Sequence, residues 1–416
     1  MRVLIINWSD TIGGSAITAY RLSKGLERRH NVECFFLVAE KKSKEPNIIC
    51  TRKNRGEYYF EVYLNKITNM IGMQYQFFPF SSRCIVKKTK ELKPDIIYLR
   101  NTHGGYFKTK LIRKLSAFAP IVWTLSDMWS FTGNGAHTFG DESWKSMKAC
   151  KDCGIYPGIG INTGRWLLRQ KKSIYQKANI SIVTPSKWLY NLSRQSPVFE
   201  GKEIKQIYNG FDLDVFTPLD KRRCRFDLGI PSDARVLMFS AENLHANPWK
   251  GGRELLEIVK LLDSKINYNV HILLAGSGDL THREALDNII YYKIGKIESD
   301  VFMATCLSAA DVYIYPTKAD NLPNALIEAI ACGVPCITFD IGGCAEIIRN
   351  GMNGYTVKPF EIETFVQRIM ECFKDDEWLN TLSLNARKCA EEVFSLKAMC
   401  KNYYQYFQEK LEYKGV

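Results

Sequence analysis

The chain has 416 residues, of which 46% are hydrophobic and 12% aromatic, which is more than one ordinary domain core holds. This composition excludes a largely disordered protein, and no apolar run reaches the roughly 18 residues that a membrane span needs. The net charge is +13, but residues 1–200 carry 32 Lys and Arg against 14 Asp and Glu, whereas the remainder is net −5. We therefore expect two domains with different partners. The basic half suits nucleic acid, anionic lipid headgroups or an anionic acceptor, and a merely soluble basic surface is an equally good interpretation.

The N-terminus begins at once with a strand pattern. Residues 1–7 read Met-Arg-Val-Leu-Ile-Ile-Asn and lead into the Gly13-Gly14 turn, which indicates a first strand and not a secretion signal. Thirteen cysteines are an odd count, and most lie in apolar contexts such as those of Cys34 and Cys336. They indicate reduced core thiols in a cytoplasmic protein.

Short apolar runs alternate with amphipathic stretches of helical length along the chain. Runs that read as buried strands lie at residues 3–7, 32–38, 95–99, 121–125 and 180–184, and the pattern starts afresh at 236–240, 270–275, 312–315 and 336–340. Helix-like stretches include residues 16–29, 252–262 and 323–332. Strands that alternate with helices predict parallel sheets covered on both faces. Two such series predict an α/β protein of two doubly wound, Rossmann-like domains.

The join between the two series lies near residues 195–220, where turn formers such as Pro197 and Pro218 gather. We therefore assign residues 1–205 to an N-terminal domain and 206–394 to a C-terminal domain. No low-complexity tract interrupts either series.

The stretch PTKADNLPNALIEAIACGVP, at 316–335, predicts an anion site. Open α/β sheets bind ligands beyond the carboxyl ends of their strands, and a helix that begins near Pro323 follows the strand at 312–316. Proline suits the first helical position because it lacks the N–H that would go unpaired there. The N–H groups of Asn324, Ala325 and Leu326 would then point at the ligand, and the helix dipole favours an anion.

Two acids flank this helix start. Glu328 lies more than one turn into the predicted helix, where a carboxylate would repel phosphate but would accept two hydrogen bonds from a ribose diol. Asp320 lies just before the helix, where it would accept hydrogen bonds from sugar hydroxyls. The alternative interpretation is an N-cap aspartate and a solvent-facing glutamate.

The same stretch, with DIGGCAEIIRNGMNGYTV at 340–357, resembles the donor-site signature of the family-4 retaining glycosyltransferases. NWSDTIGGSAITAYRLSKGL, at 7–26, is similar to the first strand, glycine loop and helix of that family. The resemblance implies the GT-B fold, with two Rossmann-like domains facing across a cleft and a last helix, about 395–416, that crosses back to the first domain. The family usually has Glu at the first acid, and here Asp320 keeps the charge with one methylene less.

The resemblance also implies roles for individual residues. Glu328 would bind the ribose, Asp320 with Asn321 and Leu322 would hold the donor sugar, and the helix start would face the diphosphate. The implied donor site comprises Gly13, Gly14, Lys250, Gly276, Asn321, Leu322, Pro323, Ala325, Leu326 and Glu328, and the implied catalytic residues are Asp320, Asp127 and His103.

Lys250, in NPWKGGRELL, resembles the lysine that this family aims at the diphosphate. A lysine and a helix N-terminus together can stabilise the charge of the leaving diphosphate without a metal ion. We therefore expect no cofactor and no catalytic metal, with the nucleotide-sugar as a substrate. Family members often add an arginine upstream, where this chain has SAENLHAN at 240–247 and offers only His245 as a substitute.

The segment VWTLSDMWSFTGNGAHTFGDESWKSMKACKDCGIYP, at 122–157, resembles a subgroup found in bacterial capsule and exopolysaccharide gene sets. That subgroup has a histidine where this chain has Ser126, although Asp127 and Trp129 remain. His103, which follows the strand at 95–99, becomes the preferred polar contact to the sugar or acceptor. A structural loop histidine is the alternative.

The same segment holds His137, Cys150 and Cys153, three possible soft ligands where a structural zinc site needs four. A zinc site, a disulfide and two thiols are the interpretations left open. The basic segment at 165–177 places Trp166, Leu167 and Ile174 among cations, which would suit docking on an anionic membrane surface. A solvated helix face is an equally good interpretation.

These observations predict a retaining glycosyltransferase that moves a sugar from a nucleoside diphosphate to a saccharide or polyprenyl-linked saccharide in surface polysaccharide biosynthesis. We expect it in the cytoplasm, with possible contact to the inner face of the plasma membrane. The alternatives are a non-hydrolysing nucleotide-sugar epimerase on the same fold and a basic lipid- or polyanion-binding module with a relic donor site. Nucleic acid is not expected as a partner, because no recognised binding motif is present.

Overall fold

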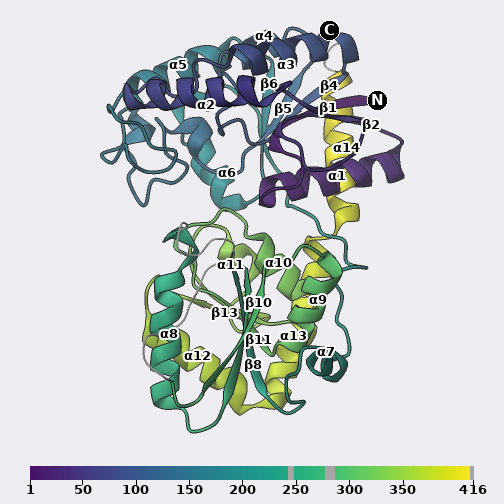
Figure 1. Ribbon diagram of the computed structural model, residues 1–416, viewed down its shortest axis with the longest axis vertical. Helices are drawn as coiled ribbons and strands as arrows, with labels where there is room; N and C mark the ends of the chain where they lie inside the picture. The colour runs from purple at the N-terminus through teal and green to yellow at the C-terminus, as the bar shows by residue number, and fades with distance from the viewer. Residues whose placement is uncertain (242–247, 277–285, 413–416) are drawn as a thin grey trace. The chain divides into compact units, whose positions relative to one another are not determined.

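The structure is a computed structural model that describes residues 1–241, 248–276 and 286–412. The chain divides into two compact units. Unit 1 comprises Met1–Gly210 and Leu396–Val416, and unit 2 comprises Phe211–Ser395. Each unit has its own parallel sheet and its own buried core, so each is described by itself (Figure 1).

The sheet of unit 1 has seven strands, and every neighbouring pair is parallel. The strands are β1 (Arg2–Ser9), β2 (Glu33–Glu40), β3 (Ile48–Cys50), β4 (Ile96–Leu99), β5 (Ile121–Thr124), β6 (Ile180–Thr184) and β7 (Ile204–Gln206). Their order across the sheet is β3-β2-β1-β4-β5-β6-β7, so the winding direction reverses between β1 and β4.

Helices cover both faces of this sheet (Figure 1). They are α1 (Gly14–His30), α2 (Arg55–Met70), α3 (Pro79–Leu92), α4 (Leu111–Leu115), α5 (Gly164–Gln176), α6 (Lys187–Arg194) and α14 (Leu396–Glu412). Side chains alternate along β1, so Val3 and Ile5 pack with α1 and α14 on one face. Leu4 and Ile6 join the opposite cluster, which contains side chains from α3, α4, α5 and α6.

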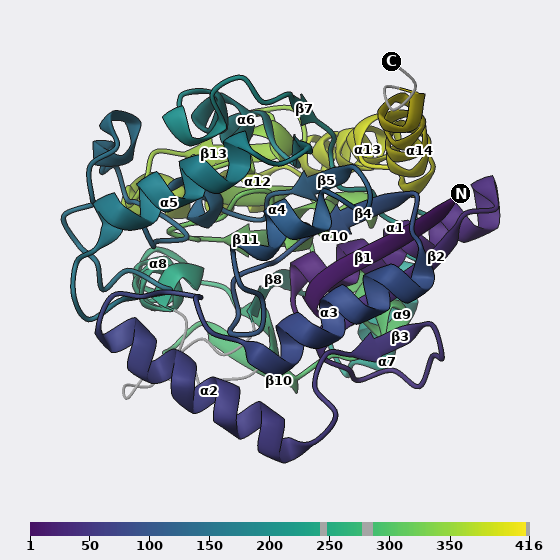
Figure 2. The ribbon, with the colours of Figure 1, turned by 90° about the horizontal axis from the view of Figure 1, so that it is seen from above.

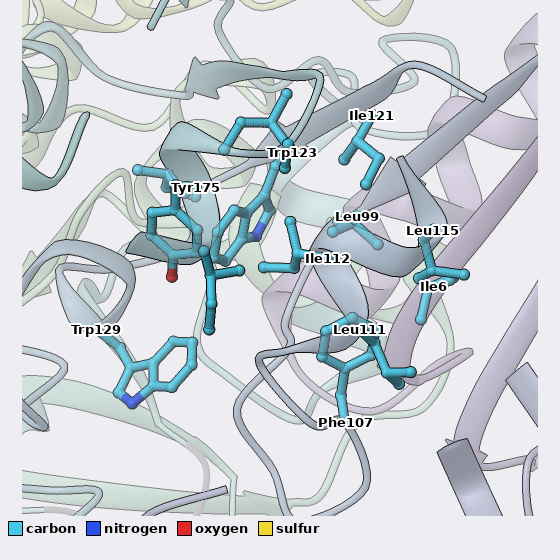
Figure 3. Packing of buried hydrophobic residues seen from close by; sticks show 14 of the residues in the cluster. Ile6, Leu99, Phe107, Leu111, Ile112, Leu115, Ile121, Trp123, Trp129 and Tyr175 are labelled. Carbon is cyan, nitrogen blue, oxygen red and sulfur yellow. The ribbon is translucent and has the colours of Figure 1, made fainter. Parts of the chain in front are cut away.

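The larger of these two clusters is rich in aromatic side chains. Figure 3 shows Trp123 and Tyr175 side by side, and their rings meet edge to face with centroids 5.4 Å apart. Ile112 packs in the same cluster, and all three side chains are at most 2% exposed. Rings of this size bury a large apolar area and fix the position of α5 against β5.

The prediction that α5 presents an apolar face to a membrane is wrong. Leu167 and Ile174 are 2% and 8% exposed, because this side of the helix packs on the core of unit 1. Only Trp166 of the three predicted contacts is exposed. Within the described residues, none of the helices combines the length and apolar composition that a membrane crossing requires.

The sheet of unit 2 has six parallel strands in the order β10-β9-β8-β11-β12-β13. The strands are β8 (Arg235–Ala241), β9 (Val270–Gly276), β10 (Ile289–Gly295), β11 (Val312–Tyr315), β12 (Cys336–Phe339) and β13 (Gly354–Val357). The helices are α7 (Lys221–Asp227), α8 (Gly252–Lys265), α9 (Asp300–Ala309), α10 (Asn324–Ala331), α11 (Cys344–Ile347), α12 (Ile362–Lys374) and α13 (Asp376–Val393). Figure 1 shows α8 and α12 on one face of this sheet, with α9, α10 and α13 on the other.

The predicted fold class is confirmed, because both units are parallel sheets wound in both directions from a central strand. In each unit the winding reverses between two neighbouring strands, β1 and β4 in unit 1 and β8 and β11 in unit 2. Ligands of such sheets bind at this point, beyond the carboxyl ends of the strands.

Candidate active site

The predicted site residues follow the strands that flank the two switch points. Gly13 follows β1 and His103 follows β4, whereas Lys250 follows β8 and Asp320 follows β11. The sequence spacing within each pair is large, but the strand order brings the two loops of each unit to the same sheet edge. The topology therefore supports a site in each unit.

In unit 2, Lys250 and Asp320 form one cluster with Tyr315, a residue that was not predicted from the sequence. Lys250 Nζ lies 2.8 Å from Asp320 Oδ2, and both side chains are half-buried. Tyr315, the last residue of β11, donates its hydroxyl to the same Asp320 oxygen at 2.7 Å and accepts from Lys250 Nζ at 3.0 Å. The backbone N–H of Asn321 donates to the other oxygen at 2.9 Å.

The charges of this cluster are set by competition between burial and pairing. Burial lowers the pKa of Lys250, but the adjacent Asp320 carboxylate outweighs it, and the pKa is raised above its usual value. Burial and the same carboxylate raise the pKa of Tyr315 well above its usual value. At neutral pH the cluster therefore holds one ammonium, one carboxylate and a neutral phenol.

Two glycines allow the loops of the cluster to approach. Gly251 has φ 74°, and a Cβ atom there would lie 1.8 Å from the carbonyl oxygen of Pro316. Gly342 has φ 61°, and a Cβ atom there would lie 1.7 Å from the carbonyl oxygen of Asp320. Any side chain at either position would displace the loop that carries Asp320.

Helix α10 begins at Asn324, one residue later than predicted. Pro323 is the N-cap residue, with φ −67° and ψ 118°, and not the first helical residue. Its extended ψ places it just outside the helix, and the first turn still contains Ala325 and Leu326, whose N–H groups point beyond the helix start. The anion site at this end of α10 stays a prediction, and the later helix start leaves the N–H groups on which it depends in the first turn.

The remaining predicted donor residues of unit 2 lie before α10, on α10 and at the end of β9. Asn321 and Leu322 are both buried at 5% exposure, and Glu328 is half-buried on the second turn of α10. Gly276 ends β9 with φ 119°, at the same edge of the sheet. The rest of its segment, from residue 277, and His245 lie outside the described residues.

In unit 1, helix α1 begins at the predicted glycines. Gly13 is the N-cap residue with φ 82°, and a Cβ atom there would meet nothing within 4 Å. The positive φ, and not crowding, is thus what requires glycine. Gly14 is the first residue of the helix.

Two further side chains lie at the start of α1. Ser126, which replaces the subgroup histidine, donates from Oγ to Ser15 Oγ at 3.0 Å. Arg100, at the end of β4, is 3% exposed and bonds the Tyr98 hydroxyl at 3.2 Å. Its Nε has no hydrogen-bond partner among residues 1–241, 248–276 and 286–412. Arg100 was not predicted as a site residue, and its position at a strand end was the only signal for it in the sequence.

His103 and Asp127 form the hydrogen-bonded pair of unit 1. His103 Nε2 lies 2.9 Å from Asp127 Oδ2, and the two side chains are 7% and 16% exposed. The other Asp127 oxygen accepts from the Trp129 N–H at 2.9 Å, and the His103 ring stacks on the Trp129 ring at 5.2 Å. Burial alone would raise the pKa of Asp127. The contacts with His103 and with this N–H lower the pKa by more than burial raises it, so the pKa lies below its usual value.

Lys171, on α5, holds the loop that follows Asp127. Its Nζ donates to the carbonyl oxygens of Trp129, Thr132 and Gly133 at 2.5, 3.0 and 3.3 Å. The same Nζ lies 3.9 Å from the centre of the Trp129 ring. Burial lowers the pKa of Lys171 to about 7, which the Asp127 carboxylate only partly opposes. From the sequence, Lys171 was interpreted as one of the surface cations of segment 165–177. This interpretation is wrong for Lys171, because its side chain is 2% exposed.

The structure does not bring together His137, Cys150 and Cys153, the residues proposed for a structural zinc site. In the part of the chain that the structure describes, no three His, Cys, Asp or Glu side chains are placed to hold a metal ion. His137 stacks on Trp188 instead, at 6.2 Å. All thirteen cysteines lie in the described part, and each is a free thiol, so Cys150 and Cys153 are not a disulfide. Burial raises the pKa of Cys150 to about 11.

Two doubly wound sheets, each with charged residues at its switch point, define the GT-B class of fold. Residues 12–215 match the family model described as Glycosyltransferase Family 4, and residues 234–375 match the model described as Glycosyl transferases group 1. The chain belongs to the family-4 glycosyltransferases.

Curated relatives match part of the chain. N-acetyl-alpha-D-glucosaminyl L-malate synthase of Bacillus anthracis is 22% identical over 211 residues, which are 49% of this chain and 52% of that protein. The putative glycosyltransferase EpsD of Bacillus subtilis is 27% identical over 210 residues, which are 48% of this chain and 53% of EpsD. The matches thus span about half the length of these relatives.

Among solved structures, HepE of Anabaena in complex with UDP is similar over 98% of this chain and 100% of that chain. The TM-score is 0.68 and the sequence identity is 15%. The complex of HepE with UDP-glucose gives a TM-score of 0.66, at 16% identity and the same coverage. At these identities the likeness concerns the fold.

Proposed function

We propose that this protein transfers a sugar from a nucleoside diphosphate to a hydroxyl group of a saccharide acceptor. The observation that carries the proposal is the cluster of Lys250, Tyr315 and Asp320 beside the N-terminus of α10. An ammonium and a helix N-terminus at one strand edge suit a diphosphate, and a carboxylate beside them suits sugar hydroxyls. The UDP and UDP-glucose complexes of HepE support a uridine nucleotide as the first donor to test.

In the proposed reaction, the bond between the anomeric carbon and the diphosphate oxygen breaks, and the acceptor oxygen forms a new bond to the same carbon. The acceptor proton passes to the leaving diphosphate. Lys250 stabilises the negative charge that develops on the leaving group, and the N–H groups at the start of α10 add to this effect. Binding of the diphosphate would draw Lys250 from Asp320, which frees carboxylate lone pairs for the sugar.

We further propose that the reaction retains the anomeric configuration and needs no metal ion. The family resemblance supports retention, and the lysine at the helix start supports charge stabilisation without a cation. We propose His103 and Asp127 as the polar contacts that unit 1 makes with a saccharide. The subgroup resemblance of residues 122–157 supports a saccharide or polyprenyl-linked acceptor in bacterial surface polysaccharide synthesis in the cytoplasm.

The test is thermal melting of the full chain with UDP, GDP, ADP, CMP and NAD, each with magnesium and with EDTA. A nucleotide at about 100 times its dissociation constant adds about 2.7 kcal/mol to the stability of the folded state, and the melting temperature rises by a few degrees. We expect UDP to give this shift in both conditions. Lys250→Ala and Glu328→Ala should abolish it.

Arg253→Ala is the matched control, because Arg253 lies three residues from Lys250, is 84% exposed and pairs only with Glu257 among the described residues. This variant should keep the full shift. If no nucleotide raises the melting temperature of the wild type in either condition, the donor site does not exist. If a shift appears with magnesium alone, metal independence is wrong. NMR of the product anomeric centre then tests retention.

A further inference from the structure

Helix α2 carries its apolar side chains on the outside of unit 1. Of its 16 residues, only Glu61 and Thr68 are buried. Tyr59, Tyr63 and Met70 are 64%, 67% and 62% exposed. Residues three or four apart share one face of a helix, so these three, with Ile67 between them, form a single stripe. Surface helices usually place such a stripe against the core, and α2 does the reverse.

The inner side of α2 is held by charged and polar contacts. Glu61 accepts from Arg52 Nε at 2.8 Å, and the two side chains are 0% and 4% exposed. Ser81, on α3, donates both its N–H and its hydroxyl to Glu61, at 2.9 and 2.6 Å. The guanidinium of Arg52 also bonds the carbonyl of Gly105. This buried network fixes the rotation of α2, so the apolar stripe cannot turn inward without leaving Glu61 unpaired.

Neighbouring aromatic side chains widen the stripe. Phe60 and Phe80 meet edge to face at 5.7 Å and are 53% and 38% exposed, and Phe77 is 44% exposed. We define the α2–α3 apolar face as Tyr59, Phe60, Tyr63, Ile67, Met70, Ile71, Phe77 and Phe80. Monomeric soluble proteins rarely expose contiguous apolar patches of this kind unless the patch binds a partner.

The charges around this face are mostly positive. Residues 53–92, which end with α3, contain seven Lys and Arg against three Glu; Glu61 is buried, and Glu91 pairs with Lys87 and Lys88. The third, Glu57, is half-buried and accepts the backbone N–H of Lys53. The exposed cations of α2 and α3 include Arg55, Lys66, Arg83, Lys87 and Lys90. A negatively charged partner surface complements this pattern.

We propose that the α2–α3 apolar face docks on the headgroup layer of a membrane rich in anionic lipid. Tyr and Phe side chains favour the boundary between headgroups and acyl chains, and each nearby cation adds about 1 kcal/mol of attraction to an anionic surface. Figure 2 shows α2 as an outer helix of its unit. The exposed stripe lies on the side of α2 away from the buried Glu61. The α2–α3 apolar face thus takes the place of α5 as the proposed membrane contact.

Docking through α2 has a consequence for the proposed acceptor. Arg52 joins the base of α2 to Gly105, which is two residues from His103. The membrane would then lie on the other side of α2 from the loop that carries His103, about one helix diameter of 10 Å away, so a lipid-linked saccharide would reach this loop past the helix. This consequence rests on the proposed function, but the docking itself does not.

The test is co-sedimentation of the full chain with vesicles of phosphatidylcholine alone and with vesicles that also contain phosphatidylglycerol. We expect binding to the anionic vesicles only, with a steep loss as salt is raised. The triple variant Tyr59→Ser/Tyr63→Ser/Met70→Ser should bind at least 10-fold more weakly. Phe226→Ser/Val301→Ser/Leu384→Ser is the matched control, because these residues of unit 2 are 75%, 65% and 66% exposed, and it should bind as the wild type does.

The UDP melting shift is measured on both triple variants. A retained shift shows that the fold is intact, and it separates a failure of docking from a failure of the proposed function. The proposal is overturned if the wild type does not bind anionic vesicles, if it binds neutral vesicles equally well, or if the α2 variant binds unchanged. It is also overturned if light scattering shows a dimer that the α2 variant dissociates while neither the wild type nor any variant binds vesicles, because the face would then join two copies.

Discussion

The Lys250–Asp320 pair of unit 2 and the His103–Asp127 pair of unit 1 each join loops that follow two strands, but they differ in what surrounds them. Lys250 and Asp320 are 30% and 19% exposed and lie beside the start of an eight-residue helix. His103 and Asp127 are 7% and 16% exposed and lie against the ring of Trp129. The unit 2 pair thus offers an accessible cation, whereas the unit 1 pair offers a ring and a carboxylate in an aromatic setting.

The supports beneath the two pairs differ as well. In unit 2, Gly251 and Gly342 lie so close to the backbone of neighbouring loops that a Cβ atom would not fit at either position. In unit 1, a buried lysine bonds three carbonyls of the loop that follows Asp127. Backbone contact is rigid and insensitive to pH, whereas a buried amine responds to pH. We therefore expect that a larger side chain at Gly251 or Gly342 disrupts the unit 2 pair, and that a change in the charge of Lys171 disrupts the unit 1 pair.

The largest expected effect follows from Gly251→Ala. The new Cβ atom would lie 1.8 Å from the Pro316 carbonyl oxygen at a residue with φ 74°, so strain and crowding add. We expect a loss of about 3 to 4 kcal/mol in the free energy of unfolding of unit 2. Denaturant titration measures this loss, and nucleotide melting should show no shift.

Gly229→Ala is the control for this variant. Gly229 has φ 70°, but a Cβ atom there would meet nothing within 4 Å. Only the backbone strain remains, so the loss should be about 1 to 2 kcal/mol, with nucleotide binding intact. Equal losses in the two variants would show that the contact with Pro316 does not hold the cluster together.

Lys171→Met should have the next largest effect. It leaves three buried carbonyl groups without their donor, and we expect a loss of about 2 to 4 kcal/mol in the free energy of unfolding. Lys172→Met, the adjacent cation, removes only an exposed pair with Glu200 and should change stability by less than about 1 kcal/mol. Denaturant titration at pH 7 compares the two variants, and equal stability would contradict a supporting role for Lys171.

The same variant gives a prediction on pH. The pKa of Lys171 is about 7 in the folded chain, because burial lowers it from 10.5. Between these values the unfolded chain binds a proton that the folded chain does not, so stability rises with pH. From pH 7 to pH 9 the wild type should gain about 2 kcal/mol relative to Lys171→Met. Below about pH 6 the difference between the two should be constant. A flat difference up to pH 9 would show that the three carbonyls keep the ammonium charged.

The sequence predicted the central strands and the start of α10 because their signals are local. Apolar runs mark the central strands, and the spacing of Asp320, Pro323 and Glu328 marks the start of α10. The outer strands β3, β7, β10 and β13 were not predicted. β3, β7 and β13 have only three or four residues, which carry no clear alternation, and the seven residues of β10 were missed despite their length. The helix start was placed one residue early because a proline can occupy either the N-cap or the first turn.

Contacts between segments that are distant in the chain could not be predicted from the sequence. Tyr315 is five residues from Asp320 but reads only as the end of a buried strand. The segment 165–177 looks amphipathic, and nothing local shows that its apolar face is already covered by the core while that of α2 is not. A buried ion pair such as that of Arg52 and Glu61 has the same sequence pattern as an exposed one.

The smallest expected effect concerns Asp127→Asn. Its carboxylate has a pKa below the usual value, so its pairing stabilises the fold above the pKa of the unfolded chain and is lost as pH falls through the folded value. At pH 7 the variant should lose about 1.5 kcal/mol, since a hydrogen bond to a charged group becomes a neutral one, and the gap to the wild type should close toward pH 3. Denaturant titration across this range measures the gap. Asp141→Asn is the control, because Asp141 accepts two backbone N–H groups, where Asp127 accepts one, and has no histidine partner among the described residues. If Asp127→Asn loses no more than Asp141→Asn, the His103 contact adds nothing. The unit 1 pair would then contribute geometry and not charge, which would sharpen its contrast with Lys250 and Asp320.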